Sequence, residues 1–444
     1  MLPIEGPDRP WREWGYVAAM RGEATLYAWT AAPSDFSLRT TDGFDSRGDY
    51  PPLALYELGM AARLYHRATG GFSRGDALTA TAKAPAVLAE AAFAVFLFLL
   101  ALRIRGVKVA RRVTMVFWLN PAMLLATSTL GYVDALAVLP AAGALVAGTA
   151  GWPALSGALI AAAVLTKPQI VLVLPAVVVA IWNCGSVNRV QSACSALMGA
   201  AVASAIILLP IILSGATRNM VLALGTLTLG KDMLSNAANL WWIVGHLLRV
   251  SAESGGDLWA AVTTPADIVA ISSFASFDSI ATRISVRAFG AILALGAIAW
   301  GMWTIRRARD LWLMSAAGAF FVHAYAVLAT QVHENHLFAA VPLLAIATIG
   351  RSRFLPLYAV LTVIFALNLN LLFGINAQDN SYAIPRMATG IDATLLLALL
   401  NCAALVWHAV VLRRECMDVA VTTRVSFPQA GERPSAPAPV GLSS

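Results

Sequence analysis

Long apolar stretches alternate with short polar connections along most of this 444-residue chain. Stretches of roughly 15 to 22 apolar residues match the length that an α-helix needs to cross a bilayer. The pattern therefore predicts an all-α polytopic membrane protein. It places eleven spanning helices, over residues 84–102, 113–130, 134–149, 153–166, 168–183, 190–214, 286–305, 311–330, 336–350, 354–374 and 391–412.

The composition favours the same fold class. Hydrophobic residues make up 59% of the chain and charged residues only 12%, with a mean hydropathy of +0.72, whereas soluble domains carry about 25% charge. The net charge of +7 does not indicate a nucleic-acid partner, because the basic residues lie mainly in short connections and form no sustained patch with aromatic residues. The four cysteines lack metal-ligand spacing; they are Cys184, Cys194, Cys402 and Cys416.

The basic residues also predict the orientation of the helices. One alternating set of connections, with the start of the C-terminal tail, holds Arg103, Arg105, Lys108, Arg111, Arg112, Arg189, Arg306, Arg307, Arg309, Arg351, Arg353, Arg413 and Arg414. The opposing short connections hold only Lys167 and Arg386. Because cytoplasmic connections are enriched in lysine and arginine, the first set is predicted to be cytoplasmic, together with the C-terminus.

This orientation divides the chain into five regions. Residues 1–83 form an external segment with interfacial helices, and residues 84–214 and 286–412 hold the membrane helices. Residues 215–285 form a second external segment, in which "NAANLWWIVGHLL" reads as a re-entrant or interfacial helix. Residues 413–444 are rich in Pro, Ala, Ser and Gly toward their end and are predicted to be a disordered cytoplasmic tail. An external N-terminus without a signal peptide is unusual, so we expect a further helix upstream.

The polar motifs of the chain share one predicted face. The motifs "RGDYPPLALY" (47–56), "LGYVD" (130–134), "LTKPQ" (165–169), "NAANLWW" (236–242) and "QVHENH" (331–336) all fall on the external side. Folding alone does not require such a one-sided distribution. It indicates a site near the outer leaflet, built by loops on a rigid helical scaffold.

The acidic residues of these segments each have two interpretations. Asp8 precedes two tryptophans and is either a base for a sugar hydroxyl or a solvated acid near a frayed terminus. Asp49, before two prolines, is either a site residue or a turn and helix-capping residue. Asp42 and Asp45 resemble a metal-binding pair, but glycine- and serine-rich loops often contain such pairs, so we expect no metal cofactor.

Two further charged residues lie at helix ends. Asp134 begins an apolar helix, where an ionisable group is costly and often functional, although aspartate also suits helix capping. Lys167 joins two apolar runs. Its ammonium either extends to the interface without another role or neutralises a phosphate.

The histidine motif is a third candidate. His333-Glu334-Asn335-His336 lacks the spacing of a zinc peptidase, since the second histidine follows at the third position and no third ligand is evident. A better interpretation is that the imidazoles donate to a phosphate or a leaving oxygen. The alternative is a polar helix cap at the bilayer surface.

Taken together, the motifs resemble the GT-C class of membrane glycosyltransferases, which use polyprenyl-phosphate sugars. The chain is most similar to the lumenal glucosyltransferases of N-glycan assembly and to bacterial polyprenyl-phosphate-mannose mannosyltransferases. The resemblance rests on Asp49-Tyr50-Pro51-Pro52-Leu53 with Tyr56, Gly131-x-x-Asp134, Thr166-Lys167-x-Gln169, Asn239-Leu240-Trp241 and Val332-His333-Glu334. These motifs cover roughly residues 8 to 350, in order and on the predicted external face.

The resemblance implies an inverting transfer of a hexose, mannose or glucose, to a glycan or glycolipid acceptor outside the cytoplasm. Asp8 would be the catalytic base, and His333 would lie near the donor phosphate, supported by Lys167. The other implied substrate-binding residues are Asp49, Tyr50, Asp134, Gln169, Trp241, Glu334 and His336. No cofactor is implied, and the expected partners are the polyprenyl-phosphate donor, the acceptor and membrane lipid.

The chain departs from the family pattern at three places. The family's Gly-Gln-x-Asp reads Gly131-Tyr132-Val133-Asp134, and the lysine that commonly follows His-Glu is Asn335. The first helix of the family has no counterpart.

Two other functional classes stay open: a transporter or flippase for a lipid-linked sugar, and an inactive member of the GT-C class. A transporter should place its polar residues near the middle of the membrane, whereas the motifs gather at the outer helix ends.

Overall fold

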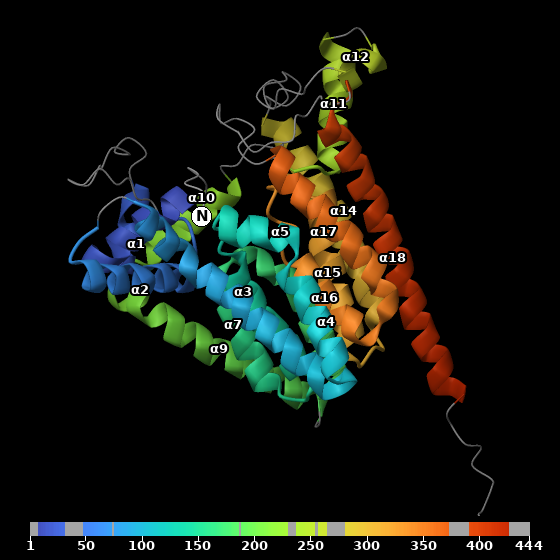
Figure 1. The fold of residues 1–444 in the computed structure, drawn as a ribbon, viewed down its shortest axis with the longest axis horizontal. Coiled ribbons are helices and arrows are strands. Elements are labelled where there is room, and N and C mark those ends of the chain that lie inside the picture. Colours follow the sequence, from blue (N-terminus) through green and yellow to red (C-terminus); the bar gives the residue numbers. More distant parts are fainter. Residues whose placement is uncertain are drawn as a thin grey trace, which may run out of the picture.

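The computed structural model describes residues 8–31, 48–72, 75–185, 188–229, 237–253, 256–263, 280–372 and 390–425. Within these ranges the chain is helical and contains no β-strand. An N-terminal group of helices packs together at one end of the molecule (Figure 1). It comprises α1 (Asp8–Arg21), η1 (Glu23–Ala31), α2 (Pro52–Thr69) and α10 (Thr217–Leu229).

Six of the described helices are long and apolar enough to cross a membrane, which indicates a multi-pass membrane protein. They are α3 (Asp76–Arg105), α9 (Arg189–Leu213), α14 (Ile280–Ile305), α15 (Leu311–Leu328), α17 (Leu355–Leu372) and α18 (Ala393–Val425). Four apolar stretches form shorter helices: α6 (Asp134–Thr149), α7 (Pro153–Thr166), α8 (Leu174–Cys184), which follows the 3-10 turn η3 (Pro168–Val173), and α16 (Ala340–Gly350). All-α architecture is thus found in the described residues, and the count of eleven spans stays a prediction.

The continuous helix predicted over 113–130 does not form. The chain there is divided into α4 (Val107–Trp118), α5 (Pro121–Met123) and the π-helical segment η2 (Leu124–Thr129). Asn120 causes the break, because its side-chain oxygen caps α5 by accepting from the backbone N–H groups of Ala122 and Met123. Its amide nitrogen donates to Tyr358 and Thr362 on α17, so the break is also a tertiary anchor.

Other boundaries differ from the predicted ones by less. The helix predicted to begin at residue 336 begins at Ala340, and the last helix continues beyond residue 412 to Val425. The second segment predicted to be external, residues 215–285, holds α11 (Leu240–Glu253) and α12 (Leu258–Thr263) besides α10. α11 packs against α15 and α18, and a re-entrant position for it stays a prediction. The end of the predicted tail, residues 426–444, lies outside the described residues.

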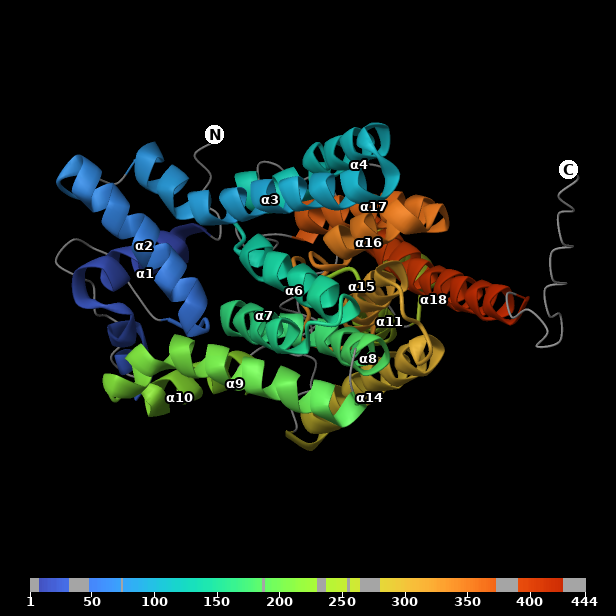
Figure 2. The ribbon, with the colours of Figure 1, turned by 90° about the horizontal axis from the view of Figure 1, so that it is seen from below.

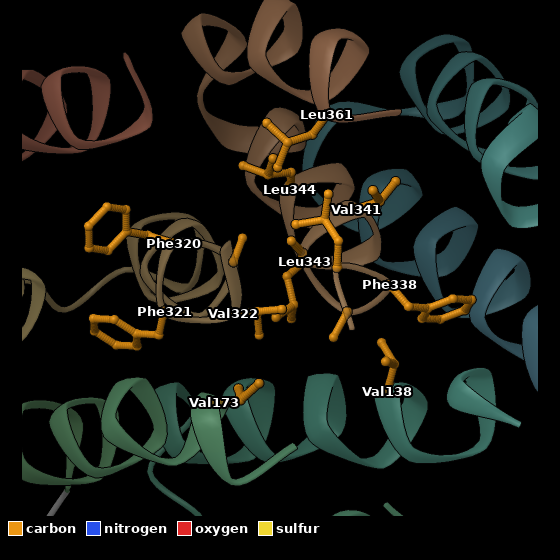
Figure 3. Close-up of a cluster of buried hydrophobic side chains, with 14 of the residues drawn as sticks. Val138, Val173, Phe320, Phe321, Val322, Phe338, Val341, Leu343, Leu344 and Leu361 are labelled. Atoms are coloured by element: carbon orange, nitrogen blue, oxygen red, sulfur yellow. The ribbon is translucent and has the colours of Figure 1, made fainter. Parts of the chain in front are cut away.

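Helices α15 and α16 form the centre of the bundle. Figure 2 shows α15 between α16 and the α6–α8 group, and Figure 3 shows side chains from α15 and α16 packed against Val138 of α6 and Val173 of η3. Nearly every residue of α16 is buried. The connection between these two helices lies at one end of the bundle and is held there by Val332, Leu337 and Phe338, which belong to the same core.

Candidate functional site

The connection between α15 and α16 carries the motif "QVHENH", and three other segments meet it. These are the loop that leads from η2 into α6, the junction of α7 with η3 at Lys167, and Tyr50 just ahead of α2. The turns that hold Arg306 and Arg351 lie at the other ends of α15 and α16. The predicted external motifs are thus brought to the end of the bundle opposite these arginines.

An ion pair lies at the centre of this cluster. The Lys167 ammonium lies 2.5 Å from Oδ2 of Asp134, and the Asn335 carboxamide donates to the same oxygen at 3.3 Å. Lys167 is buried rather than extended to an interface. Asp134 is the first residue of α6, whose N-cap is Val133 without a side-chain capping bond. Neither the interfacial interpretation of Lys167 nor the capping interpretation of Asp134 describes what these side chains do.

Two tyrosine rings lie next to the ammonium. Lys167 Nζ is 5.9 Å from the ring centroid of Tyr50 and 6.0 Å from that of Tyr132, within cation–π range. The Tyr132 hydroxyl donates to Glu334 Oε1. Burial, and then the negative charges of Glu334 and Asp134, raise the pKa of Tyr132 well above its usual value. The hydroxyl therefore stays a hydrogen-bond donor at neutral pH.

Tyr50 has a similar environment and a second set of aromatic neighbours. Its pKa is raised well above the usual value by burial and by the nearby carboxylates of Asp134, Asp49 and Glu334. The rings of Trp11 and Trp14 on α1 lie 5.0 and 5.5 Å from the Tyr50 ring. The start of α1 is therefore attached directly to the cluster.

The side chain of Asp8, the predicted catalytic base, is not among those that the structure describes. Asp8 is the first residue of α1, one turn before Trp11, and its side chain lies outside the described residues. Asp49 is partly buried and does not cap α2, whose N-cap is Pro51 without a side-chain capping bond. Asp42 and Asp45 also lie outside the described residues.

The two histidines differ in exposure and in partners. His336 is buried, and its Nδ1 accepts from the backbone N–H of His333 at 3.4 Å. The Nε2 of the same ring lies 3.3 Å from the carboxamide nitrogen of Gln169. The His333 side chain is 36% exposed, while that of Glu334 is 7% exposed. His333 is thus the imidazole that an incoming ligand can reach.

The histidine motif is not a helix cap. α16 begins only at Ala340, and its N-cap residue Ala339 makes no side-chain capping bond. The backbone ahead of the motif is unusual instead, because Gln331 has a φ of 61°. A non-glycine residue in this left-handed region is uncommon and costs about 1–2 kcal/mol, and such residues cluster at functional sites.

An asparagine of α17 holds two of the motifs together. Asn368 donates to the Glu334 carbonyl oxygen at 2.7 Å and accepts from the Ala238 N–H at 2.8 Å. Asn401 of α18 donates to the Ala238 carbonyl oxygen at 2.7 Å. The "NAANLWW" segment is therefore fixed beside the histidine motif by buried carboxamides.

Trp241 lies in this segment and anchors it. Its indole N–H donates to the Leu328 carbonyl oxygen at 2.8 Å, and its ring meets Phe289 edge to face. This bond ties the start of α11 to the last turn of α15.

Three residues at the site escaped prediction from the sequence. Tyr132 and Asn335 stand where the family pattern has other residues, yet they hydrogen-bond Glu334 and Asp134. Asn368 could have been noticed in the sequence, because a carboxamide within an apolar helix is costly unless it has a hydrogen-bond partner.

The site offers carboxylates, an ammonium and an accessible imidazole. Among the residues that the structure describes, no group of three or more His, Cys, Asp or Glu side chains is placed to hold a metal ion. The comparisons with known proteins add no relative: no protein-family model and no curated protein matches this sequence.

Proposed function

We propose that the protein is a membrane glycosyltransferase that moves a hexose from a polyprenyl-phosphate sugar to a lipid-linked or cell-envelope glycan acceptor, with inversion, on the extracytoplasmic face. One observation carries the proposal: Tyr50, Asp134, Lys167, Gln169 and the His333–His336 motif, distant in sequence, meet in one cluster. These are the motifs that resemble the GT-C class. Their position opposite the arginine-bearing turns agrees with an external site.

The charges of the cluster suit a phosphate at its edge. Asp134 neutralises Lys167, and the carboxylate of Glu334 accepts from Tyr132. A donor phosphate next to Lys167 would share its ammonium with Asp134, while the accessible His333 would donate directly to a phosphate oxygen. Fixed donors of this kind stabilise the charge that develops on a leaving group.

The proposed reaction is a single displacement. Asp8 takes the proton of the acceptor hydroxyl, and the oxygen attacks the anomeric carbon of the donor from the side opposite the phosphate. The bond between the anomeric carbon and the phosphate oxygen breaks, and its electron pair leaves with the polyprenyl phosphate. The partly buried ring of Tyr50, which packs against the buried rings of Trp11 and Trp14, offers an apolar face to the sugar or to the lipid chain.

The test uses the purified full-length protein in detergent with labelled polyprenyl-phosphate mannose or glucose and a panel of glycan and glycolipid acceptors. We expect labelled product of inverted configuration, which Asp8→Asn abolishes and His333→Gln reduces by at least tenfold. Asp76→Asn, which changes an exposed acid at the start of α3, is the matched control and should keep full activity. Full transfer by Asp8→Asn would overturn the base assignment, and no transfer with any pair would overturn the proposed function.

A transporter or flippase for a lipid-linked sugar is the second candidate, and the structure supplies one observation in its favour. Ionisable side chains are buried inside long apolar helices: Glu90 in α3, His323 in α15 and His408 in α18. Such residues often mark a substrate or proton path. Reconstituted vesicles decide between the two: movement of a fluorescent lipid-linked sugar across the bilayer without an acceptor would favour transport.

A further inference from the structure

A groove opens between α8 and α14, far from the candidate site. Its volume is about 410 Å³; α8 lines it with Val178, Trp182 and Asn183, and α14 with Met302, Trp303 and Arg306. The two helices pack against each other and lie side by side in Figure 2. α15 begins just after Arg306 and its 18 residues span about 27 Å before the histidine motif. The groove is therefore at the arginine-rich end, which we expect to be cytoplasmic.

The mouth of the groove is aromatic and positively charged. The Arg306 guanidinium lies 3.8 Å from the ring centroid of Trp303, and that of Arg189 lies 5.6 Å from the ring centroid of Trp182. The tryptophans are 65% and 45% exposed. No carboxylate in the described part of the chain forms an ion pair with either arginine. Within the described residues, Arg306 at the mouth and Arg189 beside Trp182 thus have no carboxylate at ion-pair distance.

The rest of the lining is largely apolar, and the two walls are joined at one end. Val178 and Met302 line the groove farther from the arginine-bearing ends of the same two helices. Asn183 joins the walls, because its amide nitrogen donates to the carbonyl oxygens of Arg306 at 3.0 Å and Ala308 at 2.8 Å. A ligand therefore meets a preformed groove and orders little on binding.

We propose that this groove binds an anionic phospholipid of the cytoplasmic leaflet. Its phosphate would lie at Arg306 and Arg189, and an acyl chain would follow Val178 and Met302. Tryptophan favours the headgroup level of a bilayer, and basic pockets between helices at the cytoplasmic side bind anionic headgroups. The positive charges of Arg306 and Arg189 select an anionic lipid over a zwitterionic one. This site is independent of the proposed transfer reaction.

The test measures lipid binding to the purified full-length protein in detergent by native mass spectrometry. Phosphatidylglycerol and phosphatidylcholine with the same acyl chains are compared. We expect the protein to prefer phosphatidylglycerol, and Arg306→Gln to weaken its binding about fivefold, since one basic residue contributes about 1 kcal/mol near an anionic surface. Arg306→Lys should keep most of the preference.

Arg307→Gln is the matched control, because it removes the same charge from the neighbouring exposed residue, which does not line the groove. It should bind phosphatidylglycerol like the wild type. An equal loss in both glutamine variants would show a diffuse charge effect and overturn the site, as would equal binding of the two lipids. Glycerol phosphate, which lacks acyl chains, should not bind; binding as tight as that of the lipid would replace the proposal with a free-anion site.

Discussion

The ammonium of Lys167 lies 2.5 Å from the carboxylate of Asp134, and only 2% and 7% of the two side chains are exposed. Removing two charges from water is costly, and their attraction offsets this cost only while both are present. The pair also joins the start of α6 to the junction of α7 and η3. Its integrity therefore determines how two of the motifs meet.

Breaking this pair should destabilise the protein strongly. Asp134→Asn leaves a buried ammonium without its counter-ion, so we expect the free energy of unfolding to fall by about 3–5 kcal/mol. The double variant Asp134→Asn/Lys167→Met removes both charges and should recover most of that loss. Thermal unfolding in detergent micelles measures both.

A surface ion pair gives the control for this comparison. Asp418 pairs with Arg353 where both side chains are largely exposed, and such pairs contribute little. Asp418→Asn should therefore unfold like the wild type. If Asp134→Asn also unfolds like the wild type, the buried pair does not stabilise the site.

Tyr132 should make the stability of the protein fall at alkaline pH. Its pKa is raised when folded, chiefly by burial and by Glu334, so the folded state keeps a proton that the unfolded state loses above pH about 10. The contribution of Tyr132 to the free energy of unfolding is then fully present below that pH and is lost as the pH rises further. Tyr132→Phe should reduce this slope by about 1.4 kcal/mol per pH unit. Unfolding measured at several values between pH 9 and 11 tests this, and an unchanged slope would contradict it.

The long helices were predictable because the length and apolarity of a segment alone decide whether it can cross a bilayer. The break in the helix after Trp118 was not predictable, because it depends on the hydrogen-bond partners of Asn120. That side chain caps α5 and also donates to Tyr358 and Thr362, more than 230 residues away. Without those partners the segment 113–130 reads as one apolar run.

The sequence predicted which motifs form the site, but it did not predict which of their side chains touch. The order of the motifs and the distribution of arginines place them on one face. Which side chains touch depends on the rotation of α6 and α7 about their axes and on the path of the loop after α15. Tyr132 and Asn335 therefore looked like departures from a family pattern, although in the structure they contact Glu334 and Asp134.

Glu57 on α2 should make the protein less stable as the pH rises from about 4.5 to about 7. Burial raises its pKa to about 7, and its Oε2 is buried without a hydrogen-bond partner among the residues that the structure describes. The folded state therefore binds a proton that the unfolded state releases near pH 4.5, so stability is complete below that pH and falls up to about pH 7. Glu57→Gln should remove a fall of about 3 kcal/mol. Unfolding curves of the wild type and of Glu57→Gln at pH 4.5 and 8 measure this fall. If the stability difference between the two proteins is the same at both pH values, the raised pKa of Glu57 is contradicted.

Two glycines let α7 and α9 approach closely, and alanine at either should force them apart. A methyl group on Gly157 would overlap the Ala196 carbonyl of α9, and one on Gly199 would overlap the Ala154 carbonyl of α7. Small residues allow such backbone contact between membrane helices. Because a backbone carbonyl cannot rotate away as a side chain can, we expect Gly157→Ala to cost about 3 kcal/mol.

Gly296 of α14 is the matched control, since a methyl group there meets no atom within 4 Å. Gly296→Ala should leave the melting temperature in detergent unchanged or raise it, because alanine lowers the entropic cost of a helix interior. Gly199→Ala, on the opposite side of the same crossing, should reproduce the loss seen for Gly157→Ala. Equal melting temperatures for Gly157→Ala and Gly296→Ala would mean that the helices cross at a greater separation than the structure gives.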